Sequence, residues 1–369
     1  MSFEIPFSHI AEIIMGQSPK GEEVNNEGIG LPLLNGPTEF TDRYPAPVQH
    51  TAYAKKISLP GDILFCVRGS TTGRMNYSDQ KYCIGRGLAA IRGRNGYPTP
   101  YVKAVLETYL PKLLAAATGS TFPNVSKDLI NNIPVSVLPV ENACNISKLI
   151  ELQEEKVFTN NQINQTLEQM AQALFKSWFV NFEPVKAKMA VLEAGGSQED
   201  ATLAAMTAIS GKNADALAVF EREHPEQYAE LKATAELFPL AMQDSELGEI
   251  PEGWTLSEIG AQIDIAGGAT PSTKTPDFWD NGDIHWTTPK DLSNVKDKIL
   301  LHTERKITKA GLGKISSGLL PVNTVLMSSR APVGYLAIAK VPVAINQGYI
   351  AMKCKKQLSP EYVIQRCSQ

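Results

Sequence analysis

Residues Pro60 to Gly73 read PGDILFCVRGSTTG, and residues Pro321 to Gly334 read PVNTVLMSSRAPVG. Each stretch opens on a proline, continues through an apolar run and closes on a glycine. A second pair follows them, CIGRGLAAIR (Cys83–Arg92) and AINQGYIAMK (Ala344–Lys353). One offset of 261 positions relates four landmarks: Pro60/Pro321, Gly73/Gly334, Gly87/Gly348 and Tyr101-Val102/Tyr362-Val363. The chain therefore contains a duplicated unit, which predicts two related domains.

Each copy has the pattern of a β-rich domain. Four short apolar runs are expected to be strands, residues 63–67 and 88–91 in the first copy and 325–327 and 349–352 in the second. Residues 101–117 carry apolar side chains on one helical face, and Pro111 predicts a break or kink in that helix. Upstream, Gly16–Pro19 matches Gly268–Pro271 at a different offset, which indicates an insertion in a loop between them.

A long helix is expected between the copies, over residues 141–185. Its seam alternates spacings of four and three, as in a coiled coil: Ile146, Ile150, Gln153, Val157, Asn160, Asn164, Leu167, Ala171, Leu174 and Trp178. The polar residues at the centre of the seam are of the kind that fix register and partner. Three covers are possible for such a seam: a second copy of the chain, a helix of another protein, or residues 186–245 folded back.

Residues 186–245 are rich in alanine and acidic residues and are broken at Gly195-Gly196, Gly211 and Pro225. They predict two or three short helices forming an acidic spacer without chemistry of its own. Residues 136–250 carry a formal net charge of −10, whereas residues 1–135 carry +2 and residues 251–369 carry +4. The mildly basic ends permit contact with phosphate, and the acidic middle fits a protein partner or solvent.

Several function classes are disfavoured by the composition. The five cysteines lie far apart without a C-x-x-C spacing, which argues against a zinc site or a disulfide framework and fits a reducing cytoplasm. The sequence has no apolar run long enough for a membrane span, and its first residues lack the features of a secretory signal. We therefore expect a cytoplasmic protein without metal, cofactor or membrane attachment.

The chain resembles the specificity subunits of type I restriction-modification systems. The resemblance rests on LFKSWFVNFEPVKAK (Leu174–Lys188) at the end of the long helix and on DSELGEIPEGW (residues 244–254) before the second copy. Within that copy, four segments carry it: GGATPS (Gly267–Ser272), GDIHWTTPKDL (Gly282–Leu292), SSRAPVG (Ser328–Gly334) and AINQGY (Ala344–Tyr349).

The resemblance implies an α+β protein with two target-recognition domains, each reading one half of a split DNA site. The expected domains are residues 1–140, a central helix at 141–185, a helical spacer at 186–245 and a second recognition domain at 246–369. Methyltransferase subunits and a restriction/translocase subunit are the implied partners, together with double-stranded DNA. With the offset of 261, Gln369 corresponds to Thr108, so we expect the second domain to be incomplete, as in a truncated chain.

Candidate DNA contacts come from the turns that follow matching strands. Arg68 and Arg330 lie one position out of register after their strands and could contact guanine or phosphate, or else brace the turn. Arg86 aligns with Gln347 before a glycine, and Asn346 precedes Gln347. Amide side chains suit the edge of adenine but serve equally well as buried structural groups. Further polar and basic candidates are Arg74, Lys81, Arg92, Thr270, Ser272, Lys274 and Lys290.

Enzymatic alternatives find little support. We see no cofactor-binding glycine loop, no methyltransferase Asn/Asp-Pro-Pro-Tyr/Phe segment and no nucleotide-binding G-x-x-x-x-G-K-[ST]. The carboxylates Asp277, Asp280 and Asp283 precede Lys290 as in a metal nuclease, but the first copy has no equivalent. The sequence predicts a non-catalytic DNA-recognition subunit, and the alternative is a two-headed coiled-coil scaffold that does not read DNA.

Overall fold

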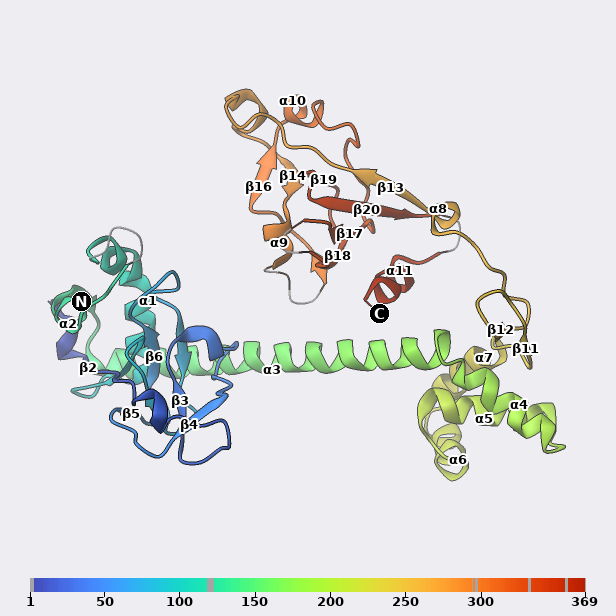
Figure 1. Cartoon of the computed structure of the whole chain (residues 1–369), viewed down its shortest axis with the longest axis horizontal. Coiled ribbons are helices and arrows are strands. Elements are labelled where there is room, and N and C mark those ends of the chain that lie inside the picture. The colour runs from blue at the N-terminus through green and yellow to red at the C-terminus, as the bar shows by residue number, and fades with distance from the viewer. Residues whose placement is uncertain are drawn as a thin grey trace. The chain divides into compact units, whose positions relative to one another are not determined.

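The computed structural model describes residues 3–117, 123–293, 295, 298–330, 333–355 and 358–368. It divides into two compact units, Met1–Ile163 and Asn164–Gln369, and each is described by itself. Both units contain strands and helices (Figure 1). The expected fold class, α+β with two related β-rich domains and a long central helix, is confirmed.

The first unit is built around a four-stranded sheet with the order β2-β9-β6-β7. Its strands are antiparallel: β2 (Ala11–Met15), β9 (Leu88–Gly93), β6 (Ile63–Cys66) and β7 (Met75–Tyr77). All four residues of β6 are buried, which explains why its sequence is a continuous apolar run without polar alternation.

A second sheet has the order β4-β3-β8-β5, in which β3 and β8 are parallel. Its strands are β4 (Gln49–Thr51), β3 (Leu31–Leu34), β8 (Tyr82–Ile84) and β5 (Ile57–Ser58). The remaining elements are the strand pair β1 (Phe3–Pro6) and β10 (Pro134–Val137), and the helices α1 (Thr99–Ala115) and α2 (Lys127–Asn132).

The predicted break at Pro111 is wrong, because helix α1 continues through this proline to Ala115. A proline inside a helix removes one backbone hydrogen bond and normally destabilises the helix by about 3 kcal/mol. Here Leu113, two residues later, is fully buried in the core, and Leu110 and Leu114 pack against that core. Tertiary packing therefore holds the last turn in place.

The second unit repeats the sheets of the first. Its larger sheet has the order β13-β20-β17-β18-β15, and its smaller sheet has the order β16-β14-β19, with β14 and β19 parallel. The strands are β13 (Ile263–Gly267), β20 (Tyr349–Cys354), β17 (Val325–Ser328), β18 (Leu336–Ala339), β15 (Ile299–Leu300), β16 (Arg305–Ile307), β14 (Ile284–Thr287) and β19 (Val343–Ile345). The duplication seen in the sequence is thus a duplication of topology.

Short helices complete the second unit: α8 (Ile259–Gln262), α9 (Pro289–Ser293), α10 (Lys309–Leu312) and α11 (Pro360–Cys367). Helix α11 is the counterpart of α1 at the offset of 261, since Tyr362-Val363 matches Tyr101-Val102.

The long helix α3 runs from Val140 to Phe179, so it ends six residues before the predicted boundary at 185. Phe182 then adopts the left-handed conformation with φ 56°, which turns the chain into the next helix. Pro184 lies in the first turn of that helix, where a proline is well tolerated because the missing N–H has no intrahelical partner. It begins a helix instead of closing one.

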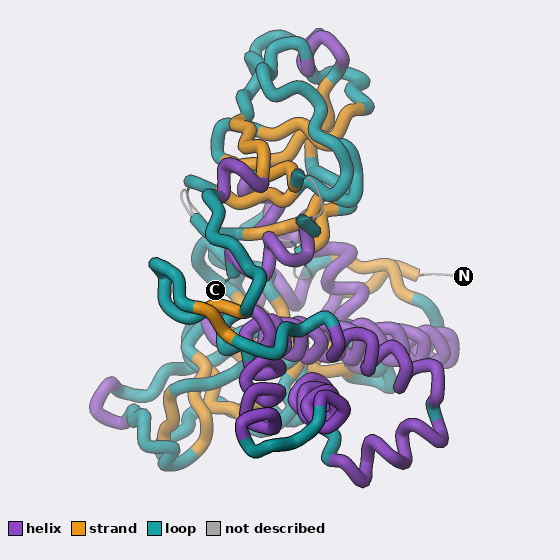
Figure 2. The backbone as a smooth tube through the Cα atoms, turned by 90° about the vertical axis from the view of Figure 1, so that its right-hand side faces the viewer, coloured by secondary structure: helices purple, strands orange, loops and turns teal. Residues whose placement is uncertain are grey.

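Four helices follow where two or three were predicted: α4 (Glu183–Glu193), α5 (Gln198–Ser210), α6 (Ala214–Glu223) and α7 (Pro225–Glu236). They are the all-helical part of the second unit (purple in Figure 2), in contrast to its strands (orange). Ala205, Met206, Leu217 and Ala235 form a small core of their own. A short hairpin of β11 (Met242–Gln243) and β12 (Ile250–Pro251) leads on to β13.

Candidate nucleic-acid interface

In both units the same loops meet at one end of the larger sheet. In the first unit, the backbone N–H of Val67 donates to the Gly87 carbonyl at 3.0 Å, directly after β6 and before β9. In the second, Ser329 donates to the Gly348 carbonyl at 2.8 Å, directly after β17 and before β20. Each bond brings the residue after the first strand beside the glycine that precedes the second strand.

This register corrects the alignment of Arg68 with Arg330. Ile63 pairs with Ile91 and Val325 pairs with Met352, so β6 and β17 are related by an offset of 262 while their partner strands keep 261. The extra residue lies in the turn before β17, and the loop after it is one residue shorter. Arg68 and Arg330 therefore occupy equivalent positions, and both are exposed.

Polar side chains from neighbouring loops join this edge in the first unit. The backbone N–H of Arg86 donates to Oγ of Ser18 at 3.1 Å, and that hydroxyl donates to Oδ1 of Asn35 at 3.2 Å. The guanidinium of Arg74 donates to the Pro37 carbonyl at 3.5 Å. The side chains of Arg68, Arg74 and Arg86 are exposed, so their charges are available to a ligand.

The second unit uses the same arrangement with different side chains. Thr270 Oγ1 donates to Oε1 of the exposed Gln347 at 2.6 Å, as a counterpart of the contact between Ser18 and Arg86. Asn346 is half-buried, and its Oδ1 accepts a hydrogen bond from the Gly348 N–H at 2.8 Å. Asn346 thus has the structural role that the sequence analysis left open for it, and Gln347 keeps its exposed amide. Ser272 and Lys274 are exposed in the adjoining loop.

Close backbone approach explains the glycines that precede Ser18 and Thr270. A Cβ on Gly16 would lie 2.1 Å from the Gly85 carbonyl oxygen, and one on Gly268 would lie 2.0 Å from that of Ile345. Both distances are far shorter than any real contact, so only glycine fits. Each loop is pressed onto the segment that carries Arg86 or Gln347.

Three of the predicted DNA contacts either lie away from this edge or are already paired with a carboxylate. Arg92 is at the far end of β9 from Arg86, and its guanidinium forms an ion pair of 2.7 Å with Asp62, whose side chain is only 4% exposed. Lys81 precedes β8, whereas the interface loops follow it. Lys290 is exposed but paired with Glu304 at 2.9 Å.

Burial raises the pKa of Asp62, although a backbone hydrogen bond from Leu59 and the Arg92 guanidinium both oppose that rise. Arg92 is thus the internal counter-ion of a buried carboxyl group.

Ser18 and Asn35 are the residues that the sequence analysis missed. Ser18 could have been found, because it aligns with the predicted Thr270 in the Gly16–Pro19 match. Asn35 follows β3 and had no signal in the sequence, because its place depends on how β3 pairs with β8.

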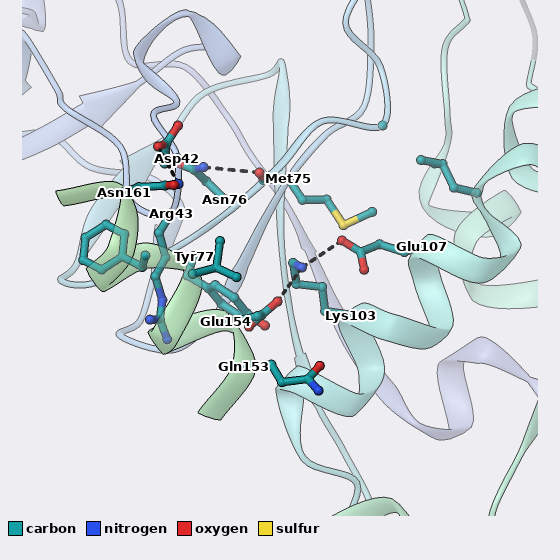
Figure 3. A pocket seen from close by; sticks show the side chains of 14 residues that line it. Asp42, Arg43, Met75, Asn76, Tyr77, Lys103, Glu107, Gln153, Glu154 and Asn161 are labelled. Carbon is teal, nitrogen blue, oxygen red and sulfur yellow. Dashed lines mark hydrogen bonds and ion pairs between the residues drawn. The ribbon is translucent and has the colours of Figure 1, made fainter. Parts of the chain in front are cut away.

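The first half of α3 is fixed to the first unit by polar contacts (Figure 3) and by aromatic packing. Lys103 Nζ on α1 lies 2.8 Å from an oxygen of Glu154 on α3 and 2.8 Å from one of Glu107. Asn161 donates to Asp42 at 3.2 Å, and Phe158 packs edge-on against Tyr44. All of these side chains except that of Tyr44 line a cavity of about 530 Å³.

The second half of α3 is fixed within the second unit by aromatic packing. Phe175 is 6% exposed, and its ring centroid lies 5.2 Å from those of Phe179 and Tyr362. Glu168 pairs with Lys298. Trp178 packs edge-on against Phe238, so one residue of the segment 186–245 covers this end of the helix.

Apolar side chains of α3 are exposed both beside these contacts, where Val157 lines the cavity, and on the opposite face of the helix. Of the predicted seam, Ile146, Val157, Leu167 and Leu174 are exposed, while Ile150 and Trp178 are partly buried. Asn160 and Asn164 have exposed side chains. The seam prediction missed four further exposed residues that lie mainly on the side away from the contacts above: Leu149, Leu152, Ile163 and Met170.

Residues 5–169 and 251–365 both match the type I restriction modification DNA specificity domain. The chain belongs to this family. The two matched stretches contain the two copies of the duplicated β-rich fold, and helices α4 to α7 lie between them.

Relatives with similar sequences are named as specificity subunits of type I restriction systems. The chain is 32% identical to the type I restriction enzyme HindI specificity subunit of Haemophilus influenzae over 80% of this chain and 66% of that protein. It is 40% identical to the MjaIX specificity subunit of Methanocaldococcus jannaschii over 33% of this chain and 28% of that protein. The HsdS subunit of Thermoanaerobacter tengcongensis is 30% identical over 43% of this chain and 38% of that one, with a TM-score of 0.37. The chain thus spans just under two thirds of the HindI relative and less of the others.

In the part of the chain that the structure describes, no cluster of three or more histidine, cysteine, aspartate or glutamate side chains could hold a metal ion. Within the same residues, no helix is both long and apolar enough to span a membrane. All five cysteines are described and carry free thiols.

Proposed function

We propose that this chain is the DNA-recognition subunit of a type I restriction-modification complex and reads a bipartite site, one half with each unit. The observation that carries the proposal is the equivalence of the two edges. Arg68 with Arg86 in one unit and Arg330 with Gln347 in the other occupy matching, exposed positions at the end of matching sheets.

The side chains at these edges have the chemistry of base readout. An arginine can donate two parallel hydrogen bonds to the N7 and O6 atoms of guanine, and a glutamine can both donate to and accept from adenine. Because Arg86 and Gln347 differ at equivalent positions, the two edges would prefer different half-sites. The hydroxyl of Ser272 and the ammonium of Lys274 suit phosphate oxygens, which fix position without reading sequence, and the hydroxyl of Thr270 orients the amide of Gln347.

The test is DNA binding by the chain assembled with its companion subunits, on a site located by footprinting. Two double variants, R68A/R86A and R330A/Q347A, are compared with K148A, which changes an exposed cation on α3. Each double variant should weaken binding by about 1–3 kcal/mol per lost base contact and relax the sequence of only one half-site.

Normal affinity and selectivity in both folded double variants would contradict this assignment. If the chain without substitutions loses all DNA binding in the presence of excess random competitor DNA, the scaffold function is favoured instead.

We propose that the chain itself is not an enzyme and that catalysis resides in partner methyltransferase and restriction/translocase subunits. The absence of cofactor and nucleotide motifs from the sequence supports this division of labour. Methyl transfer from S-adenosylmethionine, DNA cleavage or ATP hydrolysis by the purified chain alone would overturn it. A cytoplasmic location fits the free thiols of the five cysteines.

The exposed stripe of α3 supports association with another helix, and we propose that a second copy of the chain provides it. Leu167, Met170 and Leu174 are 40–56% exposed, and each such side chain contributes about 1.5–3 kcal/mol when fully buried. A clean monomer in light scattering, unchanged by Leu167→Lys, would exclude self-association. A monomer that pairs only with a methyltransferase subunit would assign the stripe to that partner.

A further inference from the structure

An arginine lies flat on a tryptophan at the outer strand of the smaller sheet in the second unit. The guanidinium carbon of Arg305, in β16, lies 3.6 Å from the ring centroid of Trp279. Trp279 in turn packs edge-on against Trp286, with their ring centroids 5.0 Å apart. Trp286 is only 2% exposed and belongs to the core of this sheet. Arg305 is therefore an exposed cation with a fixed aromatic surface beneath it.

The strand register places Arg305 near the loops that carry the proposed DNA contacts. Trp286 in β14 is paired with Arg305 on one side and with Ala344 in β19 on the other. Strand β19 ends at Ile345 and leads directly to Gln347, so this row lies at the end of the sheet that carries the proposed base contact. Neighbouring strands are about 4.8 Å apart, so the Cα of Arg305 lies roughly 10 Å to one side of the Cα of Ala344.

The two tryptophans also hold the neighbouring loop in place. Nε1 of Trp286 donates to the Ala269 carbonyl at 3.2 Å, and Nε1 of Trp279 donates to the Ser272 carbonyl at 3.0 Å. Directly opposed residues of paired strands point to the same face of a sheet, so Arg305 and Trp286 lie on the side that carries this loop. The guanidinium thus lies on the same side of the sheet as the proposed phosphate contacts.

The guanidinium of Arg305 has donors that the protein itself does not use. No hydrogen bond or ion pair joins it to another residue that the structure describes, and this includes the exposed carboxylates of Asp277 and Asp280 on the segment of Trp279. A guanidinium stacked on an aromatic ring keeps its N–H groups in one plane, with their hydrogens pointing outward from its rim. Such a group can donate two parallel hydrogen bonds to a phosphate and loses little side-chain freedom when it does so.

The equivalent place in the first unit holds an uncharged side chain. Leu33 in β3 is paired with Cys83 on one side and with Gln49 on the other. Cys83 matches Ala344 at the offset of 261, so Gln49 is the counterpart of Arg305. The cation at this place is therefore a property of the second unit alone.

We propose that Arg305, held on the ring of Trp279, binds a phosphate of the DNA backbone beside the half-site that the second unit reads. This contact rests on the proposed function and adds a residue of β16 to the edge that carries Gln347. The major groove is about 12 Å wide, so a side chain roughly 10 Å to one side of a base-reading segment meets the backbone. Phosphate contacts fix the position of a protein on the duplex, so Arg305 would set the register in which Gln347 meets its base.

The test is DNA binding by the chain assembled with its companion subunits, on the footprinted site, at salt concentrations from about 50 to about 200 mM. R305A should weaken binding to all sequences alike and reduce the slope of log K against log salt by about 0.9. Its loss of affinity should therefore shrink by about 3.5-fold over this range of salt. Ethylation of one phosphate beside the second half-site should interfere with binding by the chain without substitutions and should not interfere with binding by R305A.

Three further variants separate charge, stacking and position. R305K keeps the charge without the planar fork, so it should retain most of the salt slope and only part of the affinity. Trp279→Leu should weaken binding less in the R305A background than alone, because the ring acts through the guanidinium. The matched control is K340A, which removes an exposed cation after β18, at the opposite end of the larger sheet, and should leave the slope and the interference pattern unchanged.

Unchanged affinity, salt slope and interference in folded R305A, with the complex without substitutions bound at its site, would overturn this contact and leave the proposed function intact. A relaxed preference at one base position with an unchanged slope would assign Arg305 to a base, and the phosphate proposal would be wrong. Full additivity of Trp279→Leu and R305A would overturn the role of the stack. If the complex without substitutions binds no site selectively, the proposed function and this contact are both wrong.

Discussion

Lys103 is the residue through which the attachment of α3 to the first unit can be tested most directly. Its Nζ lies 2.8 Å from a carboxylate oxygen of Glu154 on α3 and 2.8 Å from one of Glu107 on its own helix (Figure 3). Replacement by methionine keeps the length and packing of the side chain and removes only the charge. The two carboxylates then face each other beside Tyr77, without a cation between them.

The expected cost follows from the exposure of the partners. The side chain of Lys103 is 16% exposed and that of Glu154 is 26% exposed, whereas Glu107 is 50% exposed. Removing one partner from a fully buried pair costs about 3–5 kcal/mol, and an exposed helical pair is worth about 0.3–0.5 kcal/mol. A pair of intermediate exposure should lie between these limits. We expect Lys103→Met to weaken the attachment of α3 by about 1–3 kcal/mol.

The sign of the pH dependence is also determined. Burial lowers the pKa of Lys103, but the carboxylates of Glu107 and Glu154 raise this pKa by a larger amount. The net shift of the pKa is therefore upward. A raised pKa means that the stabilisation is fully present below the unfolded value of about 10.5 and is lost as the pH rises through the folded value. Burial and the Glu154 carboxylate raise the pKa of Tyr77 as well, so its hydroxyl remains protonated. The effect of the variant should therefore be constant between about pH 6 and 9.

Hydrogen exchange is the appropriate assay, because a chain with two units has no single free energy of unfolding. Amides of residues 150–160 should exchange about 5–150-fold faster in Lys103→Met, which corresponds to 1–3 kcal/mol. The matched control is Lys112→Met, the same change at an exposed position of α1. Glu154→Gln should produce part of the effect, and the double variant should show less than the sum. Unchanged exchange in this segment, or full additivity, would refute the reasoning.

Three further predictions concern the second unit. Phe175→Ala should cost about 3–5 kcal/mol by denaturant unfolding of the unit, because it removes a 94%-buried ring that packs on Tyr362; a cost below about 1 kcal/mol would contradict this. Burial and nearby cations lower the pKa of His285, so thermal stability should fall as the pH drops below about 6.5, and His285→Gln should flatten that profile. Gly268→Ala should lower the melting temperature and weaken DNA binding, whereas Gly267→Ala, whose Cβ meets no atom within 4 Å, should do neither.

The sequence carried enough information to predict the duplication and the classes of element. A run such as residues 63–66 is apolar throughout because both of its faces are buried, and this property can be seen without a structure. The chain breaks at Gly195-Gly196, Gly211 and Pro225 also follow from local chemistry. Gly211, for example, ends α5 in the left-handed conformation that glycine adopts most easily.

Pairing between segments that lie far apart in the chain could not be predicted from the sequence. The equivalence of Arg68 and Arg330 depends on an offset of 262 that is visible only in the hydrogen bonds across strands. Arg92 looked like a surface cation until its pairing with the buried Asp62 was known. Such contacts join residues far apart in the chain, and no local pattern records them.

The face of α3 shows the same division for a helix. Its periodicity predicted a long helix with an apolar stripe, and this follows from the 3.6-residue repeat alone. The repeat does not say which stripe packs inward, because several spacings of three and four fit the same sequence. The contacts of Glu154 and Phe158 with the first unit fixed the rotation of the helix, and they left Leu149, Leu152 and Met170 exposed. Local sequence determined that a helix forms here, and tertiary packing decided which of its faces remains open to a partner.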